Sequence, residues 1–178
     1  AVARLAEDES VPATLQRNYA AMVINAATEI LAVEPEHPLA LSLSAAFEAN
    51  VLRRVGKAAG RLTLAADSED ATQPFETSLV AVPDLAIVRY EYANSLLYTY
   101  QEASAEQALA QLQAAADMPA RFAMEWLDRA YARKRLQEVQ AWRDSGMSFK
   151  RFDRKRRKFM RKENINLYAV TRPPFLVD

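Results

Sequence analysis

The chain has 178 residues, and its 23 basic and 23 acidic side chains give a formal net charge of zero. The charge is unevenly placed: residues 1–148 carry 13 basic and 20 acidic side chains, whereas residues 149–178 carry 10 basic and 3 acidic ones. The absence of cysteine excludes disulfide frameworks, cysteine-ligated zinc, iron–sulfur clusters and thiol nucleophiles. The sequence therefore predicts two parts, an acidic helical body (1–148) and a basic C-terminal segment (149–178).

The first half of the body is predicted to be helical, because the chain is rich in alanine and has only three glycines. Apolar residues at three- and four-residue spacing predict a helix over residues 12–33. The two prolines within residues 34–38 end it, and Pro38 opens a second helix that continues to Val55. His37, the only histidine, is expected in the loop between these helices.

The second half of the body begins with a polar linker at residues 65–74, followed by the best strand candidate, residues 75–82. Helix resumes after Pro83. Ser104 and Gln107 have the spacing of a capping box, which predicts a further short helix. Another helix is expected from Pro119 to Asp144.

Residues 149–163 (FKRFDRKRRKFMRKE) predict a helix in which nine of fifteen residues are basic and phenylalanines give one apolar edge. Like charges at this density repel each other, and an anionic partner would neutralise them. The candidate residues for contact with a nucleic acid or another acidic partner are Lys150, Arg151, Arg154, Lys155, Arg156, Arg157, Lys158, Arg161 and Lys162.

The sequence is compatible with several partners for this basic helix. Nucleic-acid phosphates or an acidic protein surface would neutralise it, and that surface includes the body of this chain or of a neighbouring copy. An anionic membrane would accept the phenylalanine edge but is less expected. A solvated helix whose phenylalanines pack on the body would need no partner.

The last segment, residues 164–178, is apolar, contains two prolines and is expected to be an extended arm. Free tails are usually more polar, so we expect this arm to dock by strand addition or in a groove. The docking surface is either another subunit or the chain's own body, where pairing with a strand at residues 75–82 is the simplest arrangement. The candidate docking residues are Leu167, Tyr168, Val170, Phe175, Leu176 and Val177.

The usual enzyme motifs do not occur in the sequence. It has no phosphate-binding glycine loop, dinucleotide fingerprint or nucleophile elbow, so no enzyme, cofactor or small-molecule substrate is predicted. Glu34 and His37 have the spacing of a di-iron ligand pair, but prolines flank them and no second copy exists, so no metal site is predicted.

The sequence also shows no pattern typical of a targeting signal. No apolar run is long enough for a transmembrane helix, and residues 1–10 lack the pattern of a signal peptide. A membrane partner is therefore not expected, and a cytoplasmic or virion location is the most compatible one.

These patterns predict a mainly α fold: a bundle of five or six helices with a minor β element and an extended C-terminal arm. We expect a non-enzymatic assembly component in a homo- or hetero-oligomer, comparable to a virion connector or a ribonucleoprotein subunit. Its arm would contact neighbouring subunits and its basic helix an anionic partner.

The alternative is a helical adaptor that resembles tetratricopeptide-repeat proteins and binds a peptide or partner protein. An Ala-x3-Leu-x2-Ala spacing occurs at Ala108 and again at Ala123, although tetratricopeptide repeats recur after about 34 residues. Tyr92, Tyr98 and Trp126 would line its peptide groove.

Overall fold

The computed structural model describes residues 19–56 and 71–163, and every regular element in these ranges is a helix. In chain order they are α3 (Tyr19–Val33), α4 (Pro38–Val55), α6 (Gln73–Ala81), α7 (Ala86–Tyr100), the 3-10 turn η1 (Gln101–Ser104), α8 (Ala105–Asp117), α9 (Ala123–Asp144) and α10 (Phe149–Glu163). The predicted mainly α fold is confirmed for these ranges. The predicted arm, 164–178, lies outside the described residues.

The predicted strand at residues 75–82 is wrong, because this segment forms most of α6. Phe75 and Ser78 lie on one side of the helix and are fully buried, and the Phe75 ring stacks on Tyr92 with centroids 5.0 Å apart. The Ser78 hydroxyl donates to the carbonyl of Pro38 at 2.8 Å, which ties α6 to the start of α4. A helical α6 offers no strand edge, so the predicted strand pairing with the arm has no partner there.

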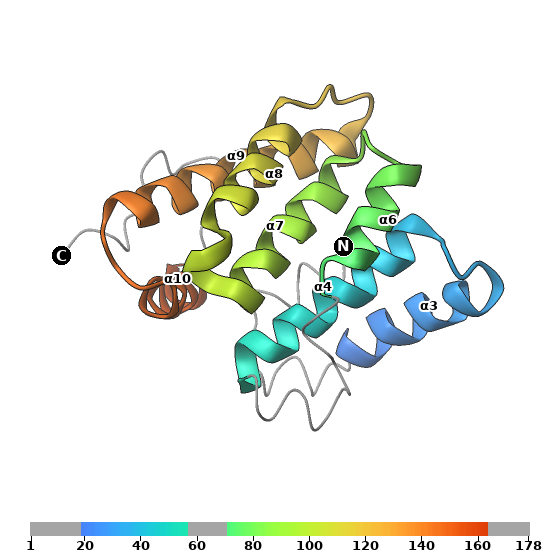
Figure 1. Ribbon diagram of the computed structural model, residues 1–178, viewed down its shortest axis with the longest axis horizontal. Helices are drawn as coiled ribbons and strands as arrows, with labels where there is room; N and C mark the ends of the chain where they lie inside the picture. The colour runs from blue at the N-terminus through green and yellow to red at the C-terminus, as the bar shows by residue number, and fades with distance from the viewer. Residues whose placement is uncertain (1–18, 57–70, 164–178) are drawn as a thin grey trace.

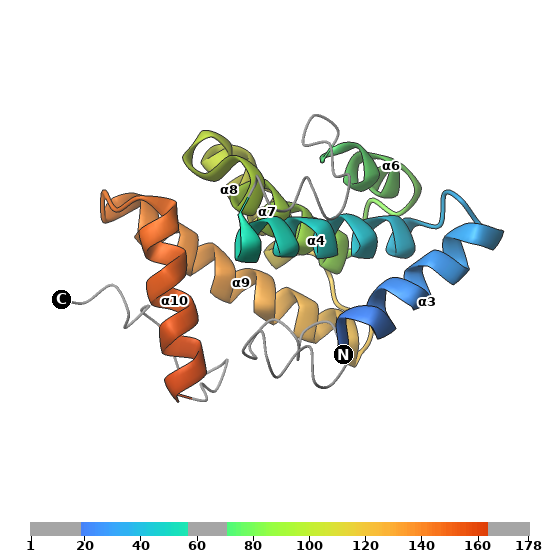
Figure 2. The same ribbon diagram turned by 90° about the horizontal axis from the view of Figure 1, so that it is seen from below.

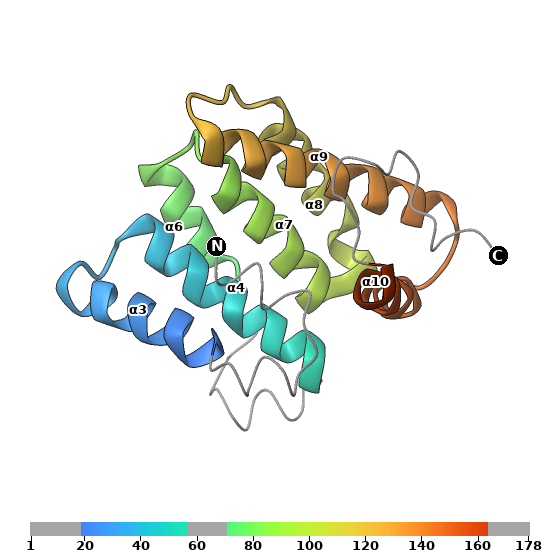
Figure 3. The same ribbon diagram turned by 180° about the vertical axis from the view of Figure 1, so that it is seen from behind.

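Helix α7 is the centre of the bundle. It lies between α4 and α8, with α9 crossing behind it (Figures 1 and 3). Most residues of α7 are buried, and the buried residues lie on every side of the helix, as expected for a helix that is enclosed by others. Leu96 and Leu97 are almost completely buried, and each such leucine contributes about 1.5–3 kcal/mol to folding.

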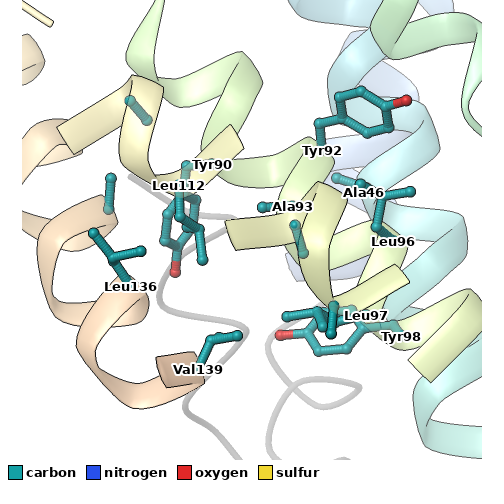
Figure 4. Close-up of a cluster of buried hydrophobic side chains, with 14 of the residues drawn as sticks. Ala46, Tyr90, Tyr92, Ala93, Leu96, Leu97, Tyr98, Leu112, Leu136 and Val139 are labelled. Carbon is teal, nitrogen blue, oxygen red and sulfur yellow. The ribbon is translucent and has the colours of Figure 1, made fainter. Parts of the chain in front are cut away.

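The tyrosines of α7 belong to this core rather than to a shared pocket. Tyr90 and Tyr92 point to different sides of the helix (Figure 4). The Tyr92 hydroxyl donates to Glu76 at 3.0 Å and accepts from Gln107 at 3.0 Å. Burial and the Glu76 carboxylate raise the pKa of Tyr92 to about 12, so the phenol stays neutral as a structural group.

Local signals explain several helix ends. His37 lies in the predicted loop and caps α4, since its Nδ1 accepts from the amide of Ala40 at 3.3 Å. Gly56 ends α4 with φ of 89°, a conformation that favours glycine. The predicted capping box is not formed, because the Ser104 hydroxyl donates to the carbonyl of Leu96 at 2.8 Å instead of capping α8.

Helix α10 has the bounds predicted from the sequence. It follows a short turn after α9 and runs across one end of the bundle, far from α3 (Figure 2). In Figure 1 it is seen end-on, which shows that its axis is steeply inclined to those of α7 and α8. None of the described helices is both long and apolar enough to cross a membrane.

Candidate functional site

The basic helix α10 rests on the body through aromatic side chains. Phe149 and Phe152 are buried and surround Trp142 of α9, with ring centroids 5.1 Å and 5.9 Å away. The indole Nε1 of Trp142 donates to the carbonyl of Met147 at 2.6 Å, which fixes the turn before α10. The amide of Phe149 donates to Glu102 at 2.6 Å, placing a carboxylate at the positive end of the helix dipole. The start of α10 is therefore firmly seated.

A buried ion pair joins α10 to α4. Nε of Arg53 donates a hydrogen bond to Oδ2 of Asp153 at 3.0 Å, and its Nη2 lies 2.7 Å from Oδ1, which adds an ionic contact without a second hydrogen bond. The guanidinium also lies 4.3 Å from the centroid of the Tyr98 ring. Arg157, one turn further along α10, donates to the same Asp153 carboxylate at 3.0 Å.

A second buried group of charges joins α10 to α9. Oε2 of Glu138 accepts from Arg156 at 2.7 Å and from Arg135 at 3.1 Å. Arg135 also donates through Nε to the side-chain oxygen of Asn94 in α7 at 2.8 Å. Its guanidinium lies 5.8 Å from the centroid of the Phe152 ring, so it contacts α9, α7 and α10 at once.

The arginines decide how the two buried carboxyls titrate. Burial alone would raise the pKa of Glu138, but the charges of Arg156 and Arg135 outweigh it and lower that pKa below its usual value. The pKa of Asp153 is lowered in the same way, since Arg53 and Arg157 outweigh the effect of burial. Both carboxylates therefore stay ionised at neutral pH and hold α10 in place.

The opposite face of α10 is turned away from the buried carboxylates Glu138 and Asp153. The exposed side chains on it are Lys150, Arg151, Arg154 and Lys158, and Lys155 beside them is partly exposed. At 100° per residue these five positions fall within one arc of the helix, and every residue of that arc is basic. We call these five residues the outer face of α10. Between residues 149 and 159 the sole acidic residue, Asp153, lies on the buried side.

The structure thus divides the nine basic residues singled out in the sequence. Arg156 and Arg157 face inward and form ion pairs. The Arg156 side chain is 13% exposed and the Arg157 side chain is 35% exposed. Five others form the outer face. The side chains of Arg161 and Lys162, and all of the arm residues, lie outside the described part of the chain.

Four residues that position this helix were not predicted from the sequence: Arg53, Asn94, Arg135 and Glu138. The available signal was the placement of Asp153 and Arg156 on the same helical face as Phe149 and Phe152, which marks polar groups on a docking edge. Two other arginines of α9 stabilise the end of a neighbouring helix. Arg129 and Arg133 donate to the carbonyls of Met118 and Ala116, at 3.0 Å and 3.2 Å, where α8 ends.

The peptide groove expected for an adaptor is not formed by the three residues named for it. Tyr92 and Tyr98 are buried, whereas Trp126 is half exposed at the start of α9. Instead, Trp126 lies in a region where Phe122 and Met124 are also more than half exposed.

Within residues 19–56 and 71–163, no three histidine or acidic residues lie close enough together to hold a metal ion. Glu34 and His37 lie in the turn between α3 and α4, and the His37 ring is engaged in capping α4.

No protein-family model matches this sequence, and no curated protein or solved structure matches it significantly.

Proposed function

We propose that this protein is a non-enzymatic assembly component, of the virion connector or ribonucleoprotein subunit type. The outer face of α10 contacts an anionic partner, and the C-terminal arm contacts neighbouring subunits. The observation that supports this proposal is that α10 has two different faces, one packed on the body and the other, the outer face, turned toward solvent. Aromatic packing and two buried carboxylates hold the helix on the body, which leaves a fixed row of five cations toward solvent.

Repulsion among the like charges of the outer face supports the proposal of an anionic partner. Clustered like charges on one helix face destabilise the helix unless they are neutralised. The carboxylates Glu138 and Asp153 pair with Arg156 and Arg157 on the inner face, so they do not offset the outer face directly. A rigid base also lowers the entropy lost when the cations meet a partner.

Removal of two outer-face charges tests the contact with an anionic partner. We expect R151A/R154A to be eluted from a heparin column at a clearly lower salt concentration than the unchanged protein, because both guanidinium groups are exposed. The matched control is R133A/R143A, which changes the net charge equally by removing two exposed arginines from α9, where Arg133 contacts the Ala116 carbonyl and Arg143 contacts Glu106. Elution of both variants at the same salt concentration would contradict a specific role for α10.

Removal of the arm tests the contact between subunits. A chain that ends at Glu163 is expected to have the mass of a monomer in native mass spectrometry, whereas the full chain has a multiple of 20.0 kDa. The basis for this expectation is the apolar composition of residues 164–178. Identical subunit counts with and without the arm would refute this half of the proposal.

A tetratricopeptide-like adaptor is the second candidate, and one observation favours it. Phe122, Met124 and Trp126 are exposed together at the start of α9, and exposed aromatic and sulfur-containing side chains are typical of protein-binding surfaces. An adaptor using this surface would keep its affinity for a peptide in R151A/R154A and in the chain without the arm. The same variants therefore separate the two candidates.

A further inference from the structure

We infer that the outer face of α10 binds the phosphate backbone of a double-helical nucleic acid. This inference rests on the proposed function, since it names the anionic partner of the same surface. The alternatives are a membrane, an acidic protein and a single-stranded nucleic acid, and the side chains of α10 distinguish among them.

A membrane partner is disfavoured by the placement of the apolar edge. Helices that bind at an anionic membrane surface bury an apolar face among the lipids. In α10 the phenylalanines that would do so pack on the body: Phe149 is 3% exposed, Phe152 is fully buried, and the partly buried Phe159 also packs against the core. The outer face offers charge alone to a lipid surface.

An acidic protein partner is disfavoured by the composition of the outer face. Protein interfaces have a core of apolar and aromatic residues and contain few lysines. The outer face consists of two arginines and three lysines, with no apolar residue between them. Interfaces with nucleic acids are more polar and far more positively charged, as this surface is.

A double helix fits the outer face better than a single strand does. Proteins that bind single strands stack the bases on exposed aromatic side chains, and the outer face has none. A duplex carries about one negative charge per 1.7 Å of its axis, and a single strand in the same geometry about half as many. The eight-residue step from Lys150 to Lys158 spans about 12 Å, a length over which a duplex presents roughly seven phosphates.

The salt dependence of binding gives a quantitative test. We would measure the fluorescence anisotropy of labelled DNA and RNA duplexes, and of single strands of equal length, with the full chain. For five neutralised phosphates, log K should fall with log salt with a slope of about −4 to −5 on a duplex. Affinity for the duplex should drop roughly 500-fold between about 50 and 200 mM salt.

The variants locate this binding on α10. R151A/R154A should reduce the slope by about 2 and weaken duplex binding roughly 60-fold at about 0.1 M salt, because two phosphate contacts are lost. R133A/R143A should leave the slope unchanged. Comparison of the DNA and RNA duplexes identifies the source of the phosphates.

The outcomes separate this inference from the proposed function. Tighter binding to single strands, to vesicles containing phosphatidylserine or to polyglutamate, lost in R151A/R154A, would overturn the duplex while keeping α10 as an anion-binding helix. If the unchanged protein binds none of these probes, or if R151A/R154A binds them all as the unchanged protein does, both the inference and the α10 part of the proposed function fail.

Discussion

The substitution Asp153→Asn is expected to lower the free energy of unfolding by about 3–5 kcal/mol, since it removes one partner of a buried ion pair. Arg53 and Asp153 are both almost fully buried, so an uncompensated guanidinium would remain where water cannot replace the carboxylate. Asn has nearly the same shape, so the loss reports charge rather than packing. Urea unfolding followed by circular dichroism measures it.

A paired replacement provides the control for this result. The variant R53M/D153L exchanges both charges for apolar side chains of similar volume, and such exchanges are often neutral or stabilising. We therefore expect it to recover most of the stability lost in Asp153→Asn. A loss below about 1 kcal/mol in Asp153→Asn would place the pair with solvent-exposed ion pairs and contradict its role in docking α10.

This network also explains why so basic a helix rests on the body in one orientation. Asp153 pairs across to α4, whereas Arg156 pairs across to Glu138 of α9. The two contacts have opposite polarity, so a rotation of α10 about its axis would bring like charges together or leave charges unpaired. The charges on the inner face thus fix which residues form the outer face.

Local signals were sufficient to predict much of the fold. The bounds of α10 follow from its helical spacing, and the turn between α3 and α4 follows from Pro35 and Pro38. The strand prediction for residues 75–82 failed because short apolar runs do not distinguish strand from buried helix. There the deciding contacts are tertiary, namely Phe75 stacked on Tyr92 and Ser78 bonded to Pro38.

The candidate site was predicted only in outline. The sequence identified the basic helix, but it treated its nine cations alike, since local charge density does not reveal which face is buried. That division depends on Arg53, a hundred residues before Asp153, and on Glu138 in another helix. Such long-range partners have no signature in the spacing of residues 149–163.

Acid should unfold this protein cooperatively, with α10 losing both of its buried carboxylate contacts. The pKa values of Glu138 and Asp153 are lowered in the folded state because their arginine partners outweigh the effect of burial. A lowered folded-state pKa contributes stability that is fully present above the unfolded-state value and is lost as the pH falls through the folded-state value. The expected window therefore begins at the ordinary values, about 4.5 for Glu138 and 3.8 for Asp153, and extends downward.

One group acts in the opposite direction. Burial raises the pKa of Glu48, so its ionisation opposes folding above the ordinary value and this penalty disappears in acid. Glu48 has no arginine among the causes of its shift, whereas Glu138 and Asp153, whose pKa values are lowered, each interact with at least two arginines. Stability should therefore fall as the pH decreases below about 4.5, and the folded chain should take up fewer protons than the unfolded one.

Urea unfolding at a series of pH values measures this dependence, and Glu138→Gln provides the comparison. The variant is less stable at neutral pH because Arg135 and Arg156 lose their shared carboxylate. Its stability should depend less steeply on pH below about 4.5, since one of the two titrating groups is gone. Equal slopes for the variant and the unchanged protein would show that Glu138 does not stabilise the fold through its charge, and the docking of α10 would then depend on Asp153 and the aromatic contacts alone.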